Sequence, residues 1–320
     1  MRAFVTGATG FVGTHVARAL LREGAAVRVL ARPGSDRRNL ADLDVEVVHG
    51  DLLEAESLPG LLAGCDEFYH VAAFYSTRPE DGPTMYRVNV EGTRNLLEAA
   101  LAAGVGRVVH TSTIGTIGRP EDGSLPTEAS PFNLWATASD YAKSKVLGEQ
   151  AALELAERGL PVVVVNPCAP VGPRDVKPTS TGQRIVDYLQ GKQPSFVSGG
   201  INFVSVADVA AGHLLAARKG QPGQRYILGH AQGNLSLADF FALMKRVSGV
   251  TLAASRRRPL VALRARLRSR WRPPRQGQQP MALTCDPSRA IRELGLPQTP
   301  LAEAFAEAVR WFRENGYVRS

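Results

Sequence analysis

The first half of the chain alternates short apolar runs with longer stretches of helical periodicity, and few folds are compatible with that alternation. Each run is almost continuously apolar and rich in β-branched residues, as expected for parallel strands covered on both faces. Six strand–helix steps predict an α/β fold, a Rossmann-type doubly wound parallel sheet, because an eight-stranded barrel needs more strands. The expected strands are Ala3–Thr6, Val27–Ala31, Val45–His49, Glu67–Val71, Arg107–Thr111 and Val162–Asn166.

The helices expected between these strands are Phe11–Arg22, Glu54–Leu62, Met85–Ala103 and Ser139–Arg158. After Pro167 the chain is punctuated by proline, glycine and serine. We therefore expect a Rossmann domain over residues 1–166 and, over residues 167–320, a small C-terminal substrate-side lobe interwoven with it. In the lobe we expect two strands, Phe203–Val206 and Tyr226–Leu228. The expected helices are one that follows the first of these strands and ends at about Ala217, one at Leu237–Val247 and one at Leu301–Asn315.

A glycine-rich turn, Gly7-Ala8-Thr9-Gly10-Phe11-Val12-Gly13, follows the first expected strand. Glycine is needed where a turn has φ > 0, where the backbone approaches a pyrophosphate and where a helix packs closely on a strand. The helix that begins here directs its N–H groups and its positive dipole end at the phosphates. Glycine triplets also occur in ordinary tight turns, but this one lies between a first strand and a helix. It predicts a dinucleotide site formed by Gly7, Thr9, Gly10, Phe11, Val12 and Gly13.

The end of the second expected strand indicates which dinucleotide binds. NAD-binding chains usually have Asp or Glu there for the ribose 2′-hydroxyl, whereas an arginine suits the 2′-phosphate of NADP. This chain has Arg32, 19 residues after Gly13, followed by Ser35, Arg37 and Arg38. A guanidinium can bind a phosphate bidentately, so NADP(H) is the preferred cofactor and NAD(H) the other candidate. A solvated loop of arginines is the alternative interpretation.

Two further strand ends complete the expected cofactor site. Asp51 and Leu52 follow the third strand, where a carboxylate could accept a hydrogen bond from the adenine amino group or cap the next helix. The fourth strand ends in small residues, so that a flat cofactor can lie across the sheet edge there, at Val71, Ala72 and Ala73. We interpret His70 as a structural residue of that strand.

The segment Tyr141-Ala142-Lys143-Ser144-Lys145 predicts a catalytic pair. Tyr141 and Lys145 are four residues apart at the start of an expected helix, so they share one face. We expect the Lys145 ammonium to lower the pKa of Tyr141 from about 10, and to hold the nicotinamide ribose. The same spacing also occurs on solvated helix faces. A hydroxyl cluster after the fifth strand, Thr111-Ser112-Thr113, strengthens the catalytic interpretation because it could hydrogen-bond a substrate oxygen.

Together these motifs resemble the extended short-chain dehydrogenase/reductases, the NAD-dependent epimerase/dehydratase superfamily. The resemblance extends through about residue 250 and rests on TGATGFVG, HVAA, the Thr-Ser-Thr run, YAKSK and NPCAPVGPRD. Within the superfamily the chain is most similar to hopanoid-associated sugar epimerases, with dihydroflavonol reductases as broader relatives. That closer likeness rests on RRNLADLDVEVVHGDL, YRVNVEGTRNLLEAA and ELGLPQTPLAEAFAEAVRWFRENGYV. The resemblance implies that Thr113, Tyr141 and Lys145 are catalytic and that Pro167 and Cys168 line the nicotinamide.

Two positions depart from the sugar-nucleotide enzymes of this superfamily. Ile201 stands where epimerases have an arginine that binds the substrate diphosphate, and Ile114-Gly115 stand where dehydratases have an acidic pair. With Arg32, these departures favour net reduction. We therefore expect an NADP(H)-dependent oxidoreductase that transfers hydride between nicotinamide and a carbonyl or hydroxyl of a small or lipid-linked, hopanoid-related substrate. The alternatives are a sugar epimerase with tightly held NAD(P) and a non-catalytic NADP-binding protein of a membrane surface.

The formal net charge of +8 arises in one segment, because residues 245–275 contain 11 Lys+Arg and no acid. Within it the Arg-rich segment, residues 256–275, has Leu260, Leu263, Leu267 and Trp271 at helical spacing. This pattern indicates a basic amphipathic helix that either lies on anionic lipid or covers the substrate pocket. No nucleic-acid-reading motif accompanies it, so we expect no nucleic-acid partner.

The remaining expectations concern metals, location and assembly. Cys65, Cys168 and Cys285 form no CxxC motif, and with no His-rich cluster we expect neither disulfides nor a metal site. We interpret Cys168 as a small packing residue. Neither a signal peptide nor a membrane-spanning run is evident, so we expect a cytoplasmic protein, peripheral at the inner membrane face if the Arg-rich segment binds lipid. The resemblance implies a homodimer paired through the helices at Met85–Ala103 and Ser139–Arg158.

Overall fold

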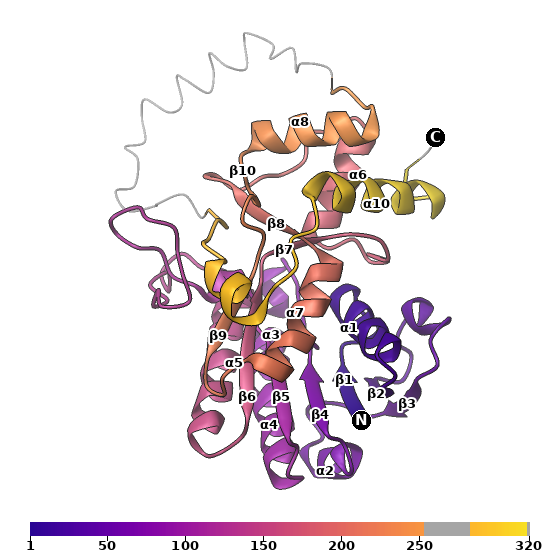
Figure 1. The fold of residues 1–320 in the computed structure, drawn as a ribbon, viewed down its shortest axis with the longest axis vertical. Coiled ribbons are helices and arrows are strands. Elements are labelled where there is room, and N and C mark those ends of the chain that lie inside the picture. The colour runs from indigo at the N-terminus through magenta and orange to yellow at the C-terminus, as the bar shows by residue number, and fades with distance from the viewer. Residues whose placement is uncertain (253–281, 319–320) are drawn as a thin grey trace.

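A seven-stranded parallel sheet forms the centre of the computed structural model, which describes residues 1–252 and 282–318 (Figure 1). The strand order is β3-β2-β1-β4-β5-β6-β9, so the order reverses between β1 and β4. The Rossmann-type α/β prediction is confirmed, and the six expected strands differ from the observed ones by at most one residue at either end. The strands are β1 (Arg2–Thr6), β2 (Ala26–Ala31), β3 (Glu46–His49), β4 (Glu67–His70), β5 (Arg107–Thr111), β6 (Val162–Pro167) and β9 (Arg225–Leu228).

Helices cover both faces of this sheet. One face carries α1 (Phe11–Arg22) and α7 (Val206–Lys219), and the other carries α2 (Leu58–Leu62), α4 (Thr93–Ala102) and α5 (Asp140–Glu157). Successive side chains of a strand point to opposite faces, so Phe4 packs in the core beneath α4 and α5, whereas Val5 packs beneath α1 and α7. The almost continuous apolar runs in the sequence follow from this two-sided burial.

Two expected helices are interrupted. The helix expected over Met85–Ala103 consists of α3 (Gly82–Tyr86), the π-helical turn η4 (Arg87–Gly92) and α4. At this turn α5 approaches closely, since a Cβ on Gly148 would be 2.4 Å from the Asn89 carbonyl oxygen. The helix expected over Glu54–Leu62 is a 3₁₀ turn, η2 (Ala55–Ser57), followed by α2, which has Pro59 in its first turn. Proline is favourable there because its missing N–H has no helical partner to lose.

A second, three-stranded sheet lies beyond one end of the main sheet, at the top of Figure 1. It contains β7 (Ala169–Val171), β8 (Ile201–Ser205) and β10 (Asn234–Leu235), and it packs with α6 (Ser180–Leu189), α8 (Leu237–Ser248) and α10 (Leu301–Glu314). Aromatic side chains fill this third core, among them Phe203, Phe240, Phe305 and Phe312. Strand β9 belongs to the main sheet although it follows β8 in the chain, so the domain boundary at residue 166 stays a prediction.

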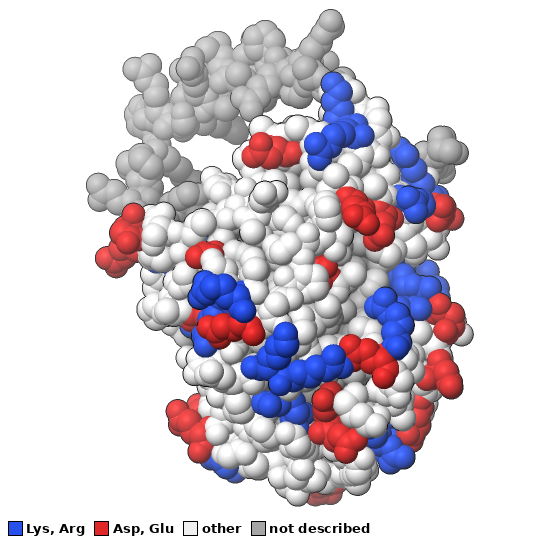
Figure 2. Space-filling model, in the orientation of Figure 1, with Lys and Arg blue, Asp and Glu red and all other residues white. Residues whose placement is uncertain are grey.

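The Arg-rich segment, residues 256–275, lies outside the described residues, and its amphipathic helix stays a prediction. Among the helices that the structure does describe, none is long and apolar enough to cross a membrane. Within residues 1–252 and 282–318, no group of three or more His, Cys, Asp or Glu side chains is placed to hold a metal ion. On the face shown in Figure 2, basic and acidic side chains lie next to one another.

Candidate active site

A cleft opens at the carboxyl ends of the main strands, toward the small sheet. Its larger part has a volume of about 1,100 Å³, and the smaller part beside the glycine-rich turn has about 330 Å³. Thr9, Gly10 and Phe11 line both parts, so the two are continuous. Ligands of doubly wound sheets bind at this edge, beside the point where the strand order reverses.

The glycine-rich turn has room for a phosphate only because it lacks side chains. Gly7 has a φ of 74°, and a Cβ there would be 2.6 Å from the Ala72 nitrogen. A Cβ on Gly13 would be 2.2 Å from the Gly7 carbonyl oxygen, so this glycine lets α1 pack against the turn. The N-cap residue of α1 is Gly10, which has no side chain to satisfy the first N–H groups of the helix. These residues therefore fit the pyrophosphate of a dinucleotide.

Most of the predicted cofactor residues lie in the smaller part of the cleft. Tyr141 and Cys168 instead line the larger part, while Lys145 and Pro167 are buried and line neither. The residues in the smaller part are Gly7, Thr9, Gly10, Phe11, Val12, Gly13, Arg32, Asp51, Leu52, Val71, Ala72 and Ala73.

Among the arginines that follow β2, Arg32 is the one that faces the cleft. It is exposed and lines both parts, together with Ser35. Arg37 and Arg38, which we expected beside Arg32, line neither part of the cleft. Arg38 pairs with Asp36 at 2.7 Å and lowers the pKa of that carboxyl to about 2, and the Nη2 of Arg37 is 3.1 Å from a nitrogen of the His49 ring. The two neighbouring arginines therefore hold the loop and leave Arg32 for the ligand.

His70 is the structural residue expected, whereas Asp51 does not cap the next helix, whose N-cap residue is Glu54. The Asp51 carboxylate accepts a hydrogen bond from the Leu53 N–H at 3.0 Å, and it also lines the smaller part of the cleft. His70 is fully buried, with one ring nitrogen 2.8 Å from the Thr6 hydroxyl and the other 3.0 Å from the Thr93 hydroxyl. His70 thus ties β4 to β1 and α4.

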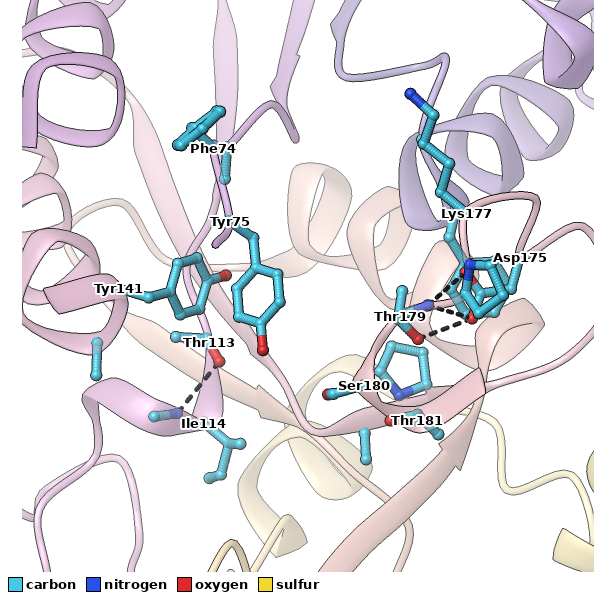
Figure 3. A pocket seen from close by; sticks show the side chains of 18 of the residues that line it. Phe74, Tyr75, Thr113, Ile114, Tyr141, Asp175, Lys177, Thr179, Ser180 and Thr181 are labelled. Carbon is cyan, nitrogen blue, oxygen red and sulfur yellow. Dashed lines mark hydrogen bonds between the residues drawn. The ribbon is translucent and has the colours of Figure 1, made fainter. Parts of the chain in front are cut away.

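Tyr141 and Thr113 project into the same region of the larger part of the cleft (Figure 3). Tyr141 lies in the first turn of α5, where Ser139 caps the helix by accepting a hydrogen bond from the Ala142 N–H at 3.2 Å. The Thr113 hydroxyl oxygen accepts from the Gly115 N–H at 3.2 Å, which leaves its proton available for donation. Ser112 is buried against Thr116 and does not line the cleft. The geometry thus favours Thr113 over Ser112.

The protonation of Tyr141 differs from the expectation. Burial, with a smaller contribution from Tyr75, raises the pKa of Tyr141 to about 12. Lys145 is buried and donates a hydrogen bond to the Thr111 carbonyl oxygen at 2.8 Å, and burial lowers the pKa of Lys145 to about 8. The pKa of Tyr141 is therefore raised in this structure and not lowered as expected, and its shift comes from burial and Tyr75, with no contribution from the Lys145 ammonium. Tyr141 carries its proton at neutral pH.

A buried carboxylate that the sequence analysis missed continues the Tyr141–Lys145 face of α5. Glu149 Oε2 lies 2.8 Å from both the Thr116 hydroxyl and the Asn166 amide nitrogen, and Oε1 pairs with Arg225 at 3.0 Å. The Thr116 hydroxyl and the Asn166 amide also contact the Thr113 carbonyl oxygen, at 2.8 and 3.3 Å. Glu149 therefore anchors the turn that carries Thr113. The repeated spacing of four residues after Lys145 is the signal that could have revealed it.

Asn89, at the π-helical turn, positions the segment that follows β4. Its side chain donates to the Phe74 carbonyl oxygen at 2.9 Å and accepts from the Phe74 N–H at 2.8 Å. It also donates to the Ser144 hydroxyl at 3.0 Å, so the segment is linked to α5. The adjacent Tyr75 ring stands edge-on to the Tyr141 ring, with 4.9 Å between centroids. Both aromatic rings consequently form one wall of the larger part of the cleft.

The two residues expected beside the nicotinamide follow β6. Pro167 is buried at the end of the strand, and Cys168 lines the larger part of the cleft. The Cys168 sulfur is 3.3 Å from that of Cys285, and burial raises the pKa of the Cys168 thiol. A neutral, buried thiol agrees with the interpretation of Cys168 as a packing residue.

Five charged residues that line the larger part were not singled out from the sequence: Asp36, Arg119, Asp175, Lys177 and Arg184. Asp175 accepts hydrogen bonds from the N–H and hydroxyl of Thr179 (Figure 3), and burial raises the pKa of Asp175 to about 6. The first four lie outside the helices and strands, where no hydrophobic period places a side chain. Arg184 lies in α6, whose position depends on helices that come much later in the chain.

A doubly wound sheet with a glycine-rich cofactor turn and a Thr–Tyr–Lys site defines an NAD(P)-dependent enzyme of the extended short-chain dehydrogenase/reductase class. The chain belongs to the NAD dependent epimerase/dehydratase family, whose family model matches residues 3–229. Enzymes of this family are dehydrogenases, reductases or epimerases that use a nicotinamide cofactor. The predicted superfamily is thus confirmed.

Three similar proteins illustrate this membership. A protein of Synechocystis sp. named as a dihydroflavonol 4-reductase is 40% identical over 99% of this chain and 96% of its own length. Sterol demethylase protein B of Methylococcus capsulatus is 37% identical over 99% of this chain and all of its own length (100%). The crystal structure of gox2253 has a TM-score of 0.85, with 39% identity and 99% of both chains covered.

Proposed function

We propose that the protein is an NADPH-dependent reductase of an apolar carbonyl compound. The observation that carries this proposal is a partly buried, protonated Tyr141 that faces the cleft beside the Thr113 hydroxyl, with Arg32 at the cofactor end of the same cleft. When bound, the nicotinamide supplies the hydride to the carbonyl carbon. The chain itself has to bind the carbonyl oxygen and supply the proton.

The residues divide this work by their positions. The Tyr141 hydroxyl donates the proton to the oxygen as negative charge develops on it, and Thr113 donates a hydrogen bond to the same oxygen. Lys145, held by the Thr111 carbonyl oxygen, lies one helical turn after Tyr141 on α5, and its charge would favour the tyrosinate that remains. The charge would act most strongly after proton transfer, because Lys145 is buried and Tyr141 is partly buried, where the dielectric is low.

NADPH is favoured over NADH by the loop after β2. Arg32 faces the cleft, and the acid nearest to it in the sequence, Asp36, is neutralised by Arg38. A carboxylate that would bind a free 2′-hydroxyl is thus missing from the end of β2, whereas a guanidinium for a 2′-phosphate is present. NADPH also suits net reduction.

Net reduction is favoured over sugar epimerisation by the substrate end of the cleft. Ile201 is fully buried and lines the larger part, at the position where the resemblance implies an arginine for a diphosphate. The name of one similar protein, which is named as a dihydroflavonol 4-reductase, supports the same choice. An apolar substrate, small or lipid-linked, fits this wall better than a sugar nucleotide.

The proposal is tested by Tyr141→Phe, which removes the proton donor and keeps the ring. We expect NADPH oxidation with a panel of apolar ketones and aldehydes to fall by at least about 100-fold, the usual effect of losing a general acid. The affinity for NADPH should stay within about twofold. Tyr86→Phe is the matched control, because its hydroxyl contacts Asp140 on the far side of α5's first turn and lines neither part of the cleft.

Turnover by Tyr141→Phe at the wild-type rate would contradict the proposal. Isomerisation of a sugar substrate without any NADPH consumption would instead identify an epimerase. A wild-type protein that binds NADPH but reduces nothing on the panel would favour the non-catalytic alternative.

A further inference from the structure

The larger part of the cleft contains a buried guanidinium that meets no carboxylate among the described residues. We propose that Arg184 binds a carboxylate on the substrate, which makes the substrate an apolar keto acid. The reaction at the ketone rests on the proposed function, whereas the carboxylate site rests on Arg184 and its surroundings alone.

The Arg184 guanidinium is held in a fixed plane by the backbone. Arg184 lies in α6 and is 9% exposed. Its Nε donates to the Ser195 carbonyl oxygen and its Nη1 to the Ser180 carbonyl oxygen, both at 2.8 Å. The remaining N–H groups lie on Nη1 and Nη2, and Arg184 is a lining residue of the larger part of the cleft. Two parallel N–H groups match the two oxygens of a planar carboxylate.

The charges around Arg184 leave its cation uncompensated. A buried guanidinium is costly unless an anion pairs with it, and burial accordingly lowers the pKa of Arg184, with Tyr75 acting in the opposite direction. The carboxyl group in the same wall, Asp175, directs both oxygens at Thr179. Arg32, Arg119 and Lys177 add further cations to this part of the cleft, and the Arg119 guanidinium donates to the Thr284 carbonyl oxygen at 2.7 Å. A substrate anion would complete this set.

The wall favours a carboxylate with an apolar body over a phosphate ester. One guanidinium end pairs with a single negative charge, and Asp175 in the same wall opposes a second one. The rest of the lining is largely apolar and extends from Thr113 toward the small sheet. It includes Ile114, Ile117, Leu134, Val176, Ile201 and Leu283. The ketone would lie at Tyr141 and the carboxylate at Arg184.

Binding of simple amphiphiles tests the carboxylate site without any turnover. Decanoate, decanamide and decyl phosphate would be titrated into the protein saturated with NADP⁺, with calorimetric detection. We expect decanoate to bind more tightly than decanamide and decyl phosphate. Arg184→Met should raise the Kd of decanoate by about 10- to 100-fold, as expected for lost hydrogen bonds between charged groups, and leave that of decanamide within about twofold.

Two further variants keep the result interpretable. Arg184→Lys keeps the positive charge but lacks the two parallel N–H groups of the guanidinium. It should therefore bind decanoate more tightly than Arg184→Met does, and show that the fold survives. Arg94→Met removes an exposed cation outside the cleft, which pairs with Glu154, and should leave the Kd of decanoate within about twofold.

The outcomes separate this inference from the proposed function. Equal affinity for decanoate and decanamide, or an unchanged Kd in Arg184→Met, would overturn the carboxylate site. Stronger binding of decyl phosphate would overturn it in favour of a phosphate ester. Arg184-dependent binding of decanoate by a protein that reduces no keto acid would support the site and count against the reductase. Reduction of neutral ketones but of no keto acid would support the reductase and count against the carboxylate site.

Discussion

At the scale of single residues, three neighbouring arginines after β2 have different surroundings. Arg32 lines both parts of the cleft, whereas Arg37 contacts His49 and Arg38 pairs with Asp36. Of these three arginines only Arg32 lines the cleft, so the proposed preference for NADPH depends on it. Asp36 would repel a 2′-phosphate if Arg38 did not neutralise it, so Arg38 would act on NADPH only indirectly.

The variant Arg32→Ala tests this distinction. We expect the Kd of NADPH to rise by about 10-fold or more, because a hydrogen-bonded charge pair with the 2′-phosphate is lost. The Kd of NADH should change by less than about twofold, since it lacks that phosphate. Fluorescence titration with each cofactor measures both values. Arg38→Ala is the control and should weaken NADPH binding less than Arg32→Ala; the opposite order would place the phosphate site elsewhere.

At this scale the sequence predicts many of the residues that line the cleft, but not their environments. The glycine-rich turn, Tyr141 and Thr113 follow from motifs whose chemistry depends on local spacing. The pKa of Tyr141 depends on how deeply α5 is packed and on Tyr75, which approaches from a distant segment. The environment of Arg184 could not be predicted either, because neither its burial nor its hydrogen bonds to Ser180 and Ser195 can be derived from the spacing of residues in the sequence.

At the scale of elements, α5 combines the functional groups of the site on one helix. Ser139 caps its start, Tyr141 and Lys145 follow on one face, and Glu149 extends that face into the core. Gly148 lets the π-helical turn with Asn89 pack closely against it. A change deep in α5 should therefore affect the active site through Lys145.

The pH dependence of turnover tests this coupling. Activity that needs the Lys145 cation should fall as pH rises through about 8, the lowered pKa of Lys145, and Glu149 raises that pKa. Glu149→Gln should thus move the alkaline midpoint of kcat to lower pH, by about half a unit to one unit. Glu154→Gln on the exposed side of α5, where Glu154 pairs with Arg94, is the control. An unchanged midpoint in Glu149→Gln would show that Lys145 does not respond to Glu149.

Elements of the main sheet were predicted closely, and those of the small sheet less well. Strands such as β5 and β6 are buried on both faces, so their apolar runs are unambiguous. Strand β7 has only three residues and contains Pro170, and β10 has only two, so neither gives a periodic signal. Helix α6 follows a proline-rich stretch and its apolar face is defined by α8 and α10, which come much later in the chain.

At the scale of the whole molecule, the cleft lies between elements of very different origin in the sequence. The glycine-rich turn supplies the cofactor end, and β7, α6 and the segment at Ala282–Leu283 supply the substrate end. The net charge of +8 says little about this cleft, because most of the excess belongs to the Arg-rich segment outside the described residues. Membrane contact through that segment, and a homodimer formed through α4 and α5, stay predictions.

The proposed function depends on net hydride transfer from NADPH to a carbonyl carbon, with Tyr141 supplying the proton. The most direct measurement uses NADPH deuterated at C4 of the nicotinamide, on the face that is transferred, with a dihydroflavonol and a series of long-chain keto acids as acceptors. Mass spectrometry of the products should show one deuterium on the new carbinol carbon for each NADPH consumed. Products that are stereoisomers of the starting compound, formed while the NADPH concentration stays constant, would contradict the account.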